Sequence, residues 1–425
     1  MRAGTATQHE RLLRLHRRNV DLSTEAGLTG VRFSDVGDGS SIVIDGRRVA
    51  NFGNCSYLGL AVDERLKRGA IEATERFGPL FSSSQMYAAI DLYSELEGLM
   101  REMTDAPAVV LPPTTTLGHL ATLPVLVGPA DAVVLDSHSH ASLQMTVQVL
   151  AARGVEILPV PHNDRPALEN TIEQACDRYR KVWYVCDGVY SMFGDLAPLE
   201  LITSLGDHHP NLYTYYDDAH GFSWLGQHGR GFVLGEVPLS ERTVVAAGLA
   251  KSFGSGGAAL FFGDPDMATT VRRLGGPMTF SGPIHPPSLG AAVASAHIHL
   301  SDEHLELRRR ILDQIRLVAT LLAHHRLPTM SWSETPIWFV RTGDPEKVVD
   351  LGGRLLDDGF YVNVSAFPAV PMGLGGVRFT HTLSNTDDQI EALIERLAHH
   401  YRQVVGEPEA VIDLTELERV GSRPS

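Results

Sequence analysis

Residues 243–262 read TVVAAGLAKSFGSGGAALFF and place two apolar segments on either side of a glycine-rich turn. The segments at 243–246 and 258–262 have the length and composition of buried strands. In the turn, Lys251 follows a run of small and apolar residues. A lysine in apolar surroundings loses part of its preference for the charged form, and the neutral amine can form a Schiff base with an aldehyde cofactor. A lysine in a surface loop is the competing interpretation.

Similar apolar segments precede this stretch along the chain. They lie at 132–135, 155–158, 182–185 and 212–216, and segments of helical length separate most of them. Apolar strands that alternate with helices are typical of parallel sheets covered on both faces. The sequence therefore predicts an α/β fold with a mostly parallel central sheet and helices on both faces.

The two ends of the chain carry other patterns. A charged, leucine-spaced helix is expected at 8–22, and a hairpin at 41–50, where Asp45-Gly46 is a type I′ turn signal. Towards the C-terminus, a long charged helix at 301–325 is followed by further elements of a smaller α+β domain. These are strands near 337–340, 361–364 and 377–380, and helices near 345–358 and 387–404.

The pattern predicts four parts. They are an N-terminal arm and hairpin at 1–55, a large cofactor-binding domain at 56–290, a small C-terminal domain at 291–405 and a polar tail at 406–425.

Composition limits the partners and the compartment. The net charge of −15 over 425 residues argues against nucleic acids and anionic membranes as partners. No segment approaches the roughly 20 apolar residues that span a bilayer. The three cysteines, Cys55, Cys176 and Cys186, have no metal-ligand spacing, so we expect reduced thiols, no metal and a cytoplasmic protein.

Polar residues follow several of the predicted strands, where open α/β sheets bind ligands. Asp217 ends an apolar strand and is placed to keep the nitrogen of a pyridine ring protonated, as pyridoxal 5′-phosphate (PLP) requires. His140 has a flat ring on which such a cofactor can stack, Ser191 can bond its phenolic oxygen, and His220 can help to hold the substrate. Taken singly, these residues are equally typical of caps and loops.

Arg378 lies on a predicted strand of the small domain. A guanidinium binds a carboxylate through two parallel hydrogen bonds, so Arg378 is a candidate for the substrate carboxylate, with a surface charge as the alternative.

Several motifs, in order along the chain, resemble those of the α-oxoamine synthases, which are fold-type I PLP-dependent transferases. SMFGDLAPL at 191–199 is the most specific match, and DDAH at 217–220 matches the family's Asp-Glu-Ala-His. HAS at 140–142 and YLGL at 57–60 also match. Phe280-Ser281 resembles the segment that reaches the phosphate site of the partner subunit. The resemblance runs from about residue 40 to 400.

The sequence departs from the family at the two ends of the expected site. Gly248 stands where relatives usually have a threonine that contacts the phosphate, and a Pro-Pro-Thr-Thr-Thr segment ending in Thr114, Thr115 and Thr116 replaces a glycine-aromatic loop. Threonines at a helix N-terminus can still bind an anion. Asn54 is offset from the family's substrate-contacting asparagine, so the substrate mouth is expected to differ.

The resemblance implies a homodimer and a decarboxylative condensation of an amino acid with an acyl thioester, of coenzyme A or of a carrier protein. It assigns catalysis to Lys251, His140 and His220, and a place in specialised metabolism is expected from the divergent mouth. The alternatives are another PLP reaction (aminotransfer, aldol-type cleavage or elimination), a non-catalytic protein with the same fold, and a dinucleotide-binding protein. The last fits poorly because the run at 254–257 is not a Gly-x-Gly-x-x-Gly motif.

Overall fold

The computed structural model describes residues 8–408 and divides them into two compact units. The large unit comprises Leu58–Ser191 and Leu196–Arg309. The small unit comprises the described residues up to Tyr57, Met192–Asp195 and the described residues from Arg310 onward. The predicted tail lies, from residue 409, outside the described residues, as do residues 1–7 of the predicted arm.

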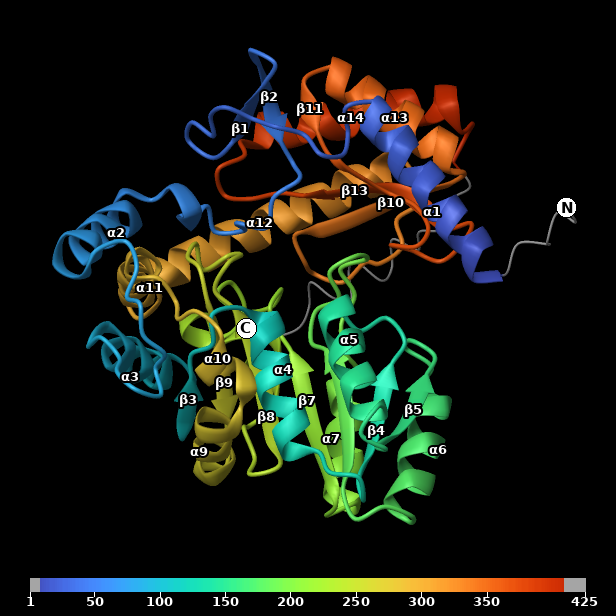
Figure 1. Ribbon diagram of the computed structural model, residues 1–425. Helices are drawn as coiled ribbons and strands as arrows, with labels where there is room; N and C mark the ends of the chain where they lie inside the picture. The colour runs from blue at the N-terminus through green and yellow to red at the C-terminus, as the bar shows by residue number, and fades with distance from the viewer. Residues whose placement is uncertain (1–7, 409–425) are drawn as a thin grey trace, which may run out of the picture. The chain divides into compact units, whose positions relative to one another are not determined.

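The large unit is built on a seven-stranded sheet in the order β3-β9-β8-β7-β6-β4-β5 (Figure 1). Only β9 runs antiparallel to its neighbours, so the prediction of a mostly parallel sheet is confirmed. The strands are β3 (Ala108–Val110), β4 (Ala132–Asp136), β5 (Glu156–Val160), β6 (Val182–Asp187), β7 (Leu212–Asp217), β8 (Thr243–Gly248) and β9 (Ala258–Phe262).

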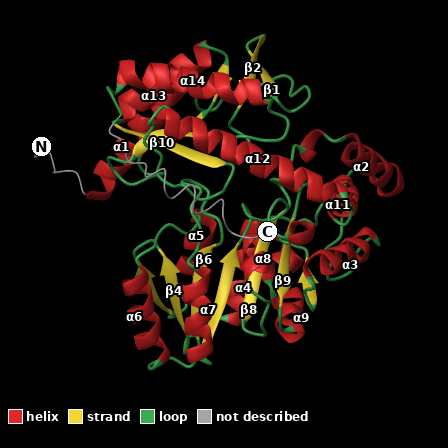
Figure 2. Ribbon diagram, turned by 180° about the vertical axis from the view of Figure 1, so that it is seen from behind, coloured by secondary structure: helices red, strands yellow, loops and turns green. Residues whose placement is uncertain are grey.

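Helices cover both faces of this sheet, as Figures 1 and 2 show from opposite sides. One apolar core joins the sheet to α4, α5 and α9, and the other joins it to α3, α6, α7 and α11. The helices of this unit are α2 (Glu64–Phe77), α3 (Leu92–Thr104), α4 (Thr115–Leu126), α5 (Ala141–Ala151), α6 (Arg165–Cys176), α7 (Leu199–His208), α8 (Gly231–Glu236), α9 (Pro265–Leu274), α10 (Gly276–Phe280) and α11 (Pro286–His299). Two 3₁₀ turns lie at η1 (Leu60–Val62) and η2 (Gln227–Gly229).

The small unit has two three-stranded sheets, β1-β2-β11 and β10-β13-β12. Its strands are β1 (Ser41–Ile44), β2 (Arg47–Asn51), β10 (Ile337–Gly343), β11 (Phe360–Tyr361), β12 (Asn363–Ser365) and β13 (Gly375–Thr380). Its helices are α1 (Gln8–Glu25), α13 (Pro345–Asp357) and α14 (Asp387–Val404), while α12 (Glu303–His324) begins in the large unit and continues into the small one.

Two details differ from the sequence-based prediction. The strand β3 was not predicted, because three residues are too few to show a periodicity. The single strand expected at 361–364 is two short strands, and Val362 separates them into different sheets. The hairpin is confirmed: Asp45 and Gly46 have φ values of 49° and 79°, the signs that a type I′ turn requires.

None of the helices within residues 8–408 is long and apolar enough to cross a membrane.

Candidate active site

The parallel strands of the large unit bring several polar residues to one edge of the sheet. Asp187 and Asp217 end β6 and β7 and are direct neighbours in the register, and Asp217 pairs with Ala246 of β8. Lys251 follows β8 by three residues and is half-buried. The parallel pairing of these strands therefore brings the three residues to one edge of the sheet.

Asp217 is buried, with 5% of its surface exposed, and is held by two donors. His119 Nε2 lies 3.0 Å from its Oδ2, and the backbone N–H of Ala219 donates to Oδ1 over 3.1 Å. Burial raises the pKa of Asp217, but the charge and hydrogen bond of His119 outweigh it and bring the pKa down to about 2. The carboxylate is therefore ionised at neutral pH despite its burial.

His119 comes from α4 and is fully buried. Its other nitrogen, Nδ1, lies 2.8 Å from the hydroxyl of Tyr215 on β7. Sequence reasoning missed both residues, because a single histidine in an apolar helix is more often a core residue than a functional one. The only signal was its place in the turn after the threonines that open α4.

Asp187 has the opposite protonation tendency to Asp217. Burial raises the pKa of Asp187 well above its usual range, and the negative charge of Asp217 raises it further. Its Oδ1 accepts the backbone N–H of His140 at 3.0 Å. The pKa of Asp187 is thus raised while that of its neighbour Asp217 is lowered. Neighbouring carboxyls with oppositely shifted pKa values are typical of catalytic sites.

His140 caps the N-terminus of α5 and is exposed. Its Nδ1 lies 2.7 Å from Ser142 Oγ, which fixes the plane of the ring. Although the residue is exposed, the protein atoms around its ring keep part of the water away and lower the pKa of His140; the charge of Lys251 adds to this and that of Asp217 opposes it. The imidazole is therefore neutral at pH 7, as a stacking ring should be.

The three threonines predicted to bind an anion lie at the start of α4. Thr114 is the N-cap, and its hydroxyl accepts the N–H of Leu117 at 3.1 Å. A Cβ added at Gly248 would lie 3.3 Å from Thr115 Oγ1, so the Thr115 hydroxyl occupies the space beside the missing side chain. Thr116 is half-buried in the first turn of the same helix.

The remaining predicted residues of the large unit are Ser191, His220 and Ser281. Ser191 is half-buried after β6, and His220 is buried in the loop after β7. Ser281 ends α10, where its hydroxyl donates to the carbonyl of Pro277 at 2.6 Å.

Arg378 and Asn54 belong to the small unit. Arg378 lies on β13 with 8% of its surface exposed, and it donates to Asn363 Oδ1 over 3.2 Å. Asn54 uses its Oδ1 to accept the N–H of Ser56 at 2.9 Å. The guanidinium of Arg378 also lies 4.0 Å from the sulfur of Cys55, the residue after Asn54.

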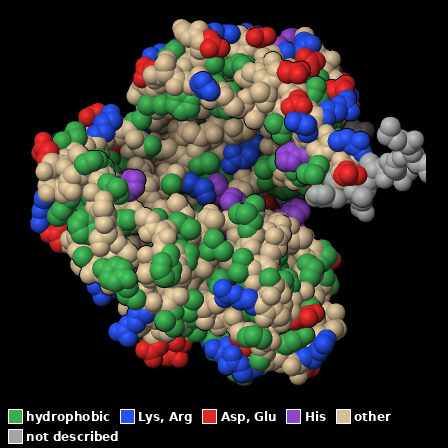
Figure 3. Space-filling model, in the orientation of Figure 1, with side chains coloured by type: hydrophobic (Ala, Val, Ile, Leu, Met, Phe, Trp, Pro, Cys, Tyr) green, Lys and Arg blue, Asp and Glu red, His purple; other side chains and the backbone are tan. Residues whose placement is uncertain are grey.

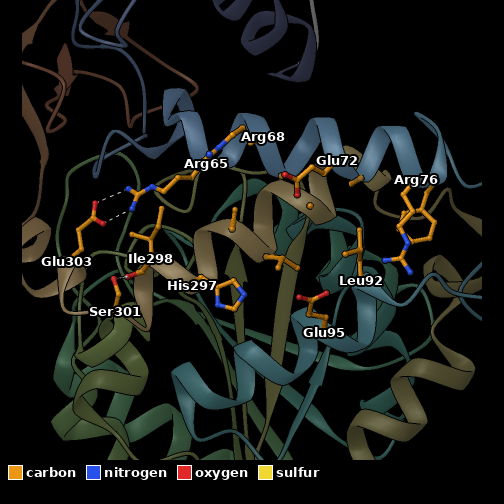
Figure 4. Close-up of a pocket in the computed structure, with 16 residues that line it drawn as sticks. Arg65, Arg68, Glu72, Arg76, Leu92, Glu95, His297, Ile298, Ser301 and Glu303 are labelled. Atoms are coloured by element: carbon orange, nitrogen blue, oxygen red, sulfur yellow. Dashed lines mark hydrogen bonds and ion pairs between the residues drawn. The ribbon is translucent and has the colours of Figure 1, made fainter.

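A cavity lies elsewhere in the large unit, between α2, α3 and α11 (Figure 4). It measures about 800 Å³, and its rim alternates arginines with glutamates. Figure 4 shows Arg65 turned towards Glu303, to which it donates at 2.6 Å. Its lining contains three arginines and three glutamates, so the formal charges of these side chains balance.

The residues at the sheet edge fit PLP. An ionised, buried carboxylate suits a pyridinium nitrogen, an exposed neutral imidazole suits the ring face, and hydroxyls at a helix N-terminus suit a phosphate. A lysine at the end of the adjoining strand suits the aldehyde. Fold and site together define a fold-type I PLP-dependent enzyme.

Comparison with known proteins agrees. The model of the family "Aminotransferase class I and II" matches residues 49–397. The 8-amino-7-oxononanoate synthase of Symbiobacterium thermophilum is 33% identical over 85% of this chain and 91% of its own length. That of Dechloromonas aromatica is 32% identical over 89% of this chain and 97% of its own length.

Solved structures share the fold. Serine palmitoyltransferase from S. paucimobilis, with a bound PLP–myriocin aldimine, superposes with a TM-score of 0.85 at 24% identity, covering 94% of this chain and 99% of that one. The Sphingomonas wittichii serine palmitoyltransferase superposes with a TM-score of 0.84 at 22% identity, covering 95% and 100%.

The chain belongs to the aminotransferase class I and II family and, within it, to the α-oxoamine synthases. It is a PLP-dependent acyl-transferring enzyme, and its reaction is the decarboxylative condensation of an amino acid with an acyl thioester.

Proposed function

We propose that Lys251 binds the cofactor aldehyde and then moves the α-proton of the amino acid during the condensation. Bound PLP supplies the electron sink that makes this proton acidic. Asp217 holds the pyridine nitrogen in its protonated form, His140 covers one face of the ring, and Ser191 and His220 bond the phenolic oxygen and the substrate. His140 and His220 line the reacting atoms and help to exclude water from them.

One observation carries this proposal: the buried carboxyl of Asp217 lies 3.0 Å from His119 Nε2 and accepts the N–H of Ala219, contacts that lower its pKa to about 2. An isolated buried carboxylate would take up a proton, because burial penalises the charged form. The chain instead supplies His119 to keep the charge. A carboxylate kept in its ionised form can also bind a cationic group of a ligand, and Lys251 follows the strand that pairs with β7. These two residues would hold such a cofactor, with Asp217 serving its ring nitrogen and Lys251 its aldehyde.

The phosphate is proposed to bind at the N-terminus of α4. The first-turn N–H groups of a helix favour an anion, and the hydroxyls of Thr115 and Thr116 add donors there. The position of Thr115 Oγ1 beside Gly248 supports the idea that a threonine from α4 replaces the side chain that Gly248 lacks. Ser281 is proposed to reach the phosphate of a partner subunit.

The substrates are proposed to be an amino acid and the thioester of coenzyme A or a carrier protein. Arg378 is proposed to bind the amino acid carboxylate, because a guanidinium can hold a carboxylate through two parallel hydrogen bonds and that of Arg378 lies on β13 with 8% of the residue exposed. Asn54 is proposed to contact the substrate from the same sheet region. These two roles are tested by Arg378→Lys and Asn54→Ala, which should raise the KM for the amino acid more than they lower kcat.

The main experiment uses PLP-loaded protein in deuterated water with a panel of amino acids. We expect one amino acid to exchange its α-proton, and to release carbon dioxide only when an acyl thioester is added. Lys251→Ala should abolish both events, whereas Lys67→Ala, which removes an exposed lysine paired with Glu64, should change neither. Accumulation of a keto acid would instead establish aminotransfer, and condensation by Lys251→Ala would refute the role of Lys251.

A homodimer is proposed on the basis of exposed apolar side chains in the large unit. Phe280 is 88% exposed, Tyr87 81%, Leu274 68% and Met145 53%. Figure 3 shows hydrophobic side chains spread over the front of this unit, the face that carries α4 and α5. A dimer interface is proposed to bury these exposed side chains and to join them into one apolar patch, the kind of surface at which proteins associate. Sedimentation should give twice the chain mass, and Phe280→Asp should lower it; a monomeric, fully active protein would refute the dimer.

A further inference from the structure

Ser223, in the loop after β7, has an unusual backbone conformation. It is fully buried and has a φ of 86°, in the left-handed region that favours glycine. A non-glycine residue there costs about 1–3 kcal/mol and persists only where its surroundings hold it. Glycine would adopt this conformation without strain. A serine at this position therefore needs a role for its side chain, and the functional group of that side chain is the hydroxyl.

The surroundings of Ser223 hold all its polar groups. Its N–H donates to the carbonyl of Gly229 at 2.8 Å, and its own carbonyl accepts from His304 Nε2 at 2.8 Å. Its hydroxyl oxygen lies 2.8 Å from His299 Nε2 and 3.2 Å from Ser252 Oγ. The hydroxyl thus joins a histidine of α11 to the residue that follows Lys251.

The direction of these hydrogen bonds follows from His299. Its Nδ1 lies 2.8 Å from the carbonyl of Ser295, so Nδ1 carries the proton. Burial lowers the pKa of His299 to about 3, with the neighbouring His304 adding to the effect, so the ring is neutral and Nε2 is an acceptor. The Ser223 hydroxyl is therefore placed to donate to His299 Nε2, and the same oxygen also lies within hydrogen-bond distance of Ser252 Oγ.

The turn that presents Lys251 is tied to α11 at further points. Ser295 donates its hydroxyl to the carbonyl of Phe253 at 2.7 Å, and Ser255 donates its hydroxyl to the carbonyl of Ser288 at 2.6 Å. Within the turn, the N–H of Gly254 bonds the carbonyl of Lys251 at 3.0 Å. Ser252 is the one residue of this turn that the strained serine holds.

We propose that Ser223 and His299 are positioning residues that act through Ser252 to fix the turn carrying Lys251. The proposal rests on the role of Lys251 in binding PLP. The backbone strain at Ser223 is then the energetic cost of placing a hydroxyl beside the turn. The series of hydrogen bonds through Ser252, Ser223, His299 and Ser295 links the turn to α11, and this holds Lys251 in a fixed position.

The test separates position from stability. Ser223→Gly removes the hydroxyl and the strain together, so its urea midpoint should equal or exceed that of the unchanged protein. We expect its rate of capturing PLP as a borohydride-stable label on Lys251, measured by mass spectrometry, to fall about fivefold to tenfold, the worth of one hydrogen bond. Ser252→Ala should fall by the same factor, and the double variant should fall no further, because both changes break one chain.

Controls make every outcome decisive. Thr104→Val, which removes a buried hydroxyl from α3, should leave the capture rate unchanged. Capture at the normal rate by Ser223→Gly or by Ser252→Ala overturns the proposal. Labelling of a residue other than Lys251 refutes instead the role of Lys251 itself, so the two failures are distinguishable.

Discussion

His119→Leu should change the charge state of Asp217. In the folded protein, the pKa of this carboxyl stands at about 2 against an ordinary 3.8, because the charge and hydrogen bond of His119 overcome the effect of burial. The difference corresponds to about 2 kcal/mol in favour of the ionised form. Without His119, burial becomes the dominant influence and should raise the pKa above 3.8.

The sign of the pH dependence should therefore reverse. With His119, the lowered pKa adds stability above pH 3.8, and this is lost as the pH falls through about 2. In His119→Leu, a raised pKa adds stability below pH 3.8 and loses it as the pH rises. The variant should be less stable than the unchanged protein by about 2 kcal/mol or more at pH 7, and the gap should narrow towards pH 4.

Urea unfolding of the cofactor-free protein at several pH values between 4 and 7 measures this gap. His119→Gln is the matched control, because the glutamine amide N–H can still donate to Asp217 although it carries no charge. Its stability at pH 7 should lie between those of the unchanged protein and His119→Leu. Tyr215→Phe removes only the hydroxyl at the far nitrogen of His119. Parallel pH profiles for His119→Leu and the unchanged protein would show that His119 does not set the charge of Asp217.

Three further results are expected. A Cβ at Gly290 would lie 2.1 Å from a backbone oxygen of α2, so Gly290→Ala should lower the urea midpoint by the equivalent of about 1–3 kcal/mol. At Gly98 an added Cβ would have no neighbour within 4 Å, so Gly98→Ala should raise the midpoint by the equivalent of about 0.5–1 kcal/mol. Burial raises the pKa of Asp218 to about 8. The protonated carboxyl therefore adds stability that is complete below pH 3.8 and declines as the pH rises towards 8. Asp218→Asn should remove this decline in unfolding curves measured from about pH 4 to 8. Thr114→Ala deprives the first turn of α4 of its cap and should cost about 1 kcal/mol of stability in thermal unfolding, and Thr114→Ser should restore it.

The central sheet was predictable because its strands are apolar throughout. A strand buried on both faces needs no alternation, so 132–136, 182–187 and 243–248 were recognisable from composition alone. The split between β11 and β12 was not, since the sequence around Val362 is continuous and only pairing with two different sheets divides it. Pairing partners are a property of the tertiary fold.

The residues at the strand ends were predictable for the same reason, because the end of an apolar strand is visible in the sequence. The partners that tune them were not. His119 and Asp217 are 98 positions apart, and nothing in the composition of α4 indicates that its histidine faces a carboxylate. The strain at Ser223 was equally hidden, because a Gly-Phe-Ser-Trp segment permits many backbone conformations and only the fold selects a φ of 86°.

Asp187, Asp217 and Asp218 are three of the buried carboxyls at this edge of the sheet, and their pKa values are shifted in different directions. Burial raises the pKa of Asp187 well above its usual range and that of Asp218 to about 8, while His119 brings the pKa of Asp217 to about 2. Each ionised carboxyl disfavours ionisation of its neighbours, so holding the charge on Asp217 helps to keep the other two protonated. Among these three carboxyls, the ionised form is therefore favoured only for Asp217, at the end of β7 and beside the strand that leads to Lys251. A site for a dianionic metal-binding pair would distribute charge over two carboxylates, whereas one fixed charge opposite an amine matches a ring that carries one cationic nitrogen and one aldehyde.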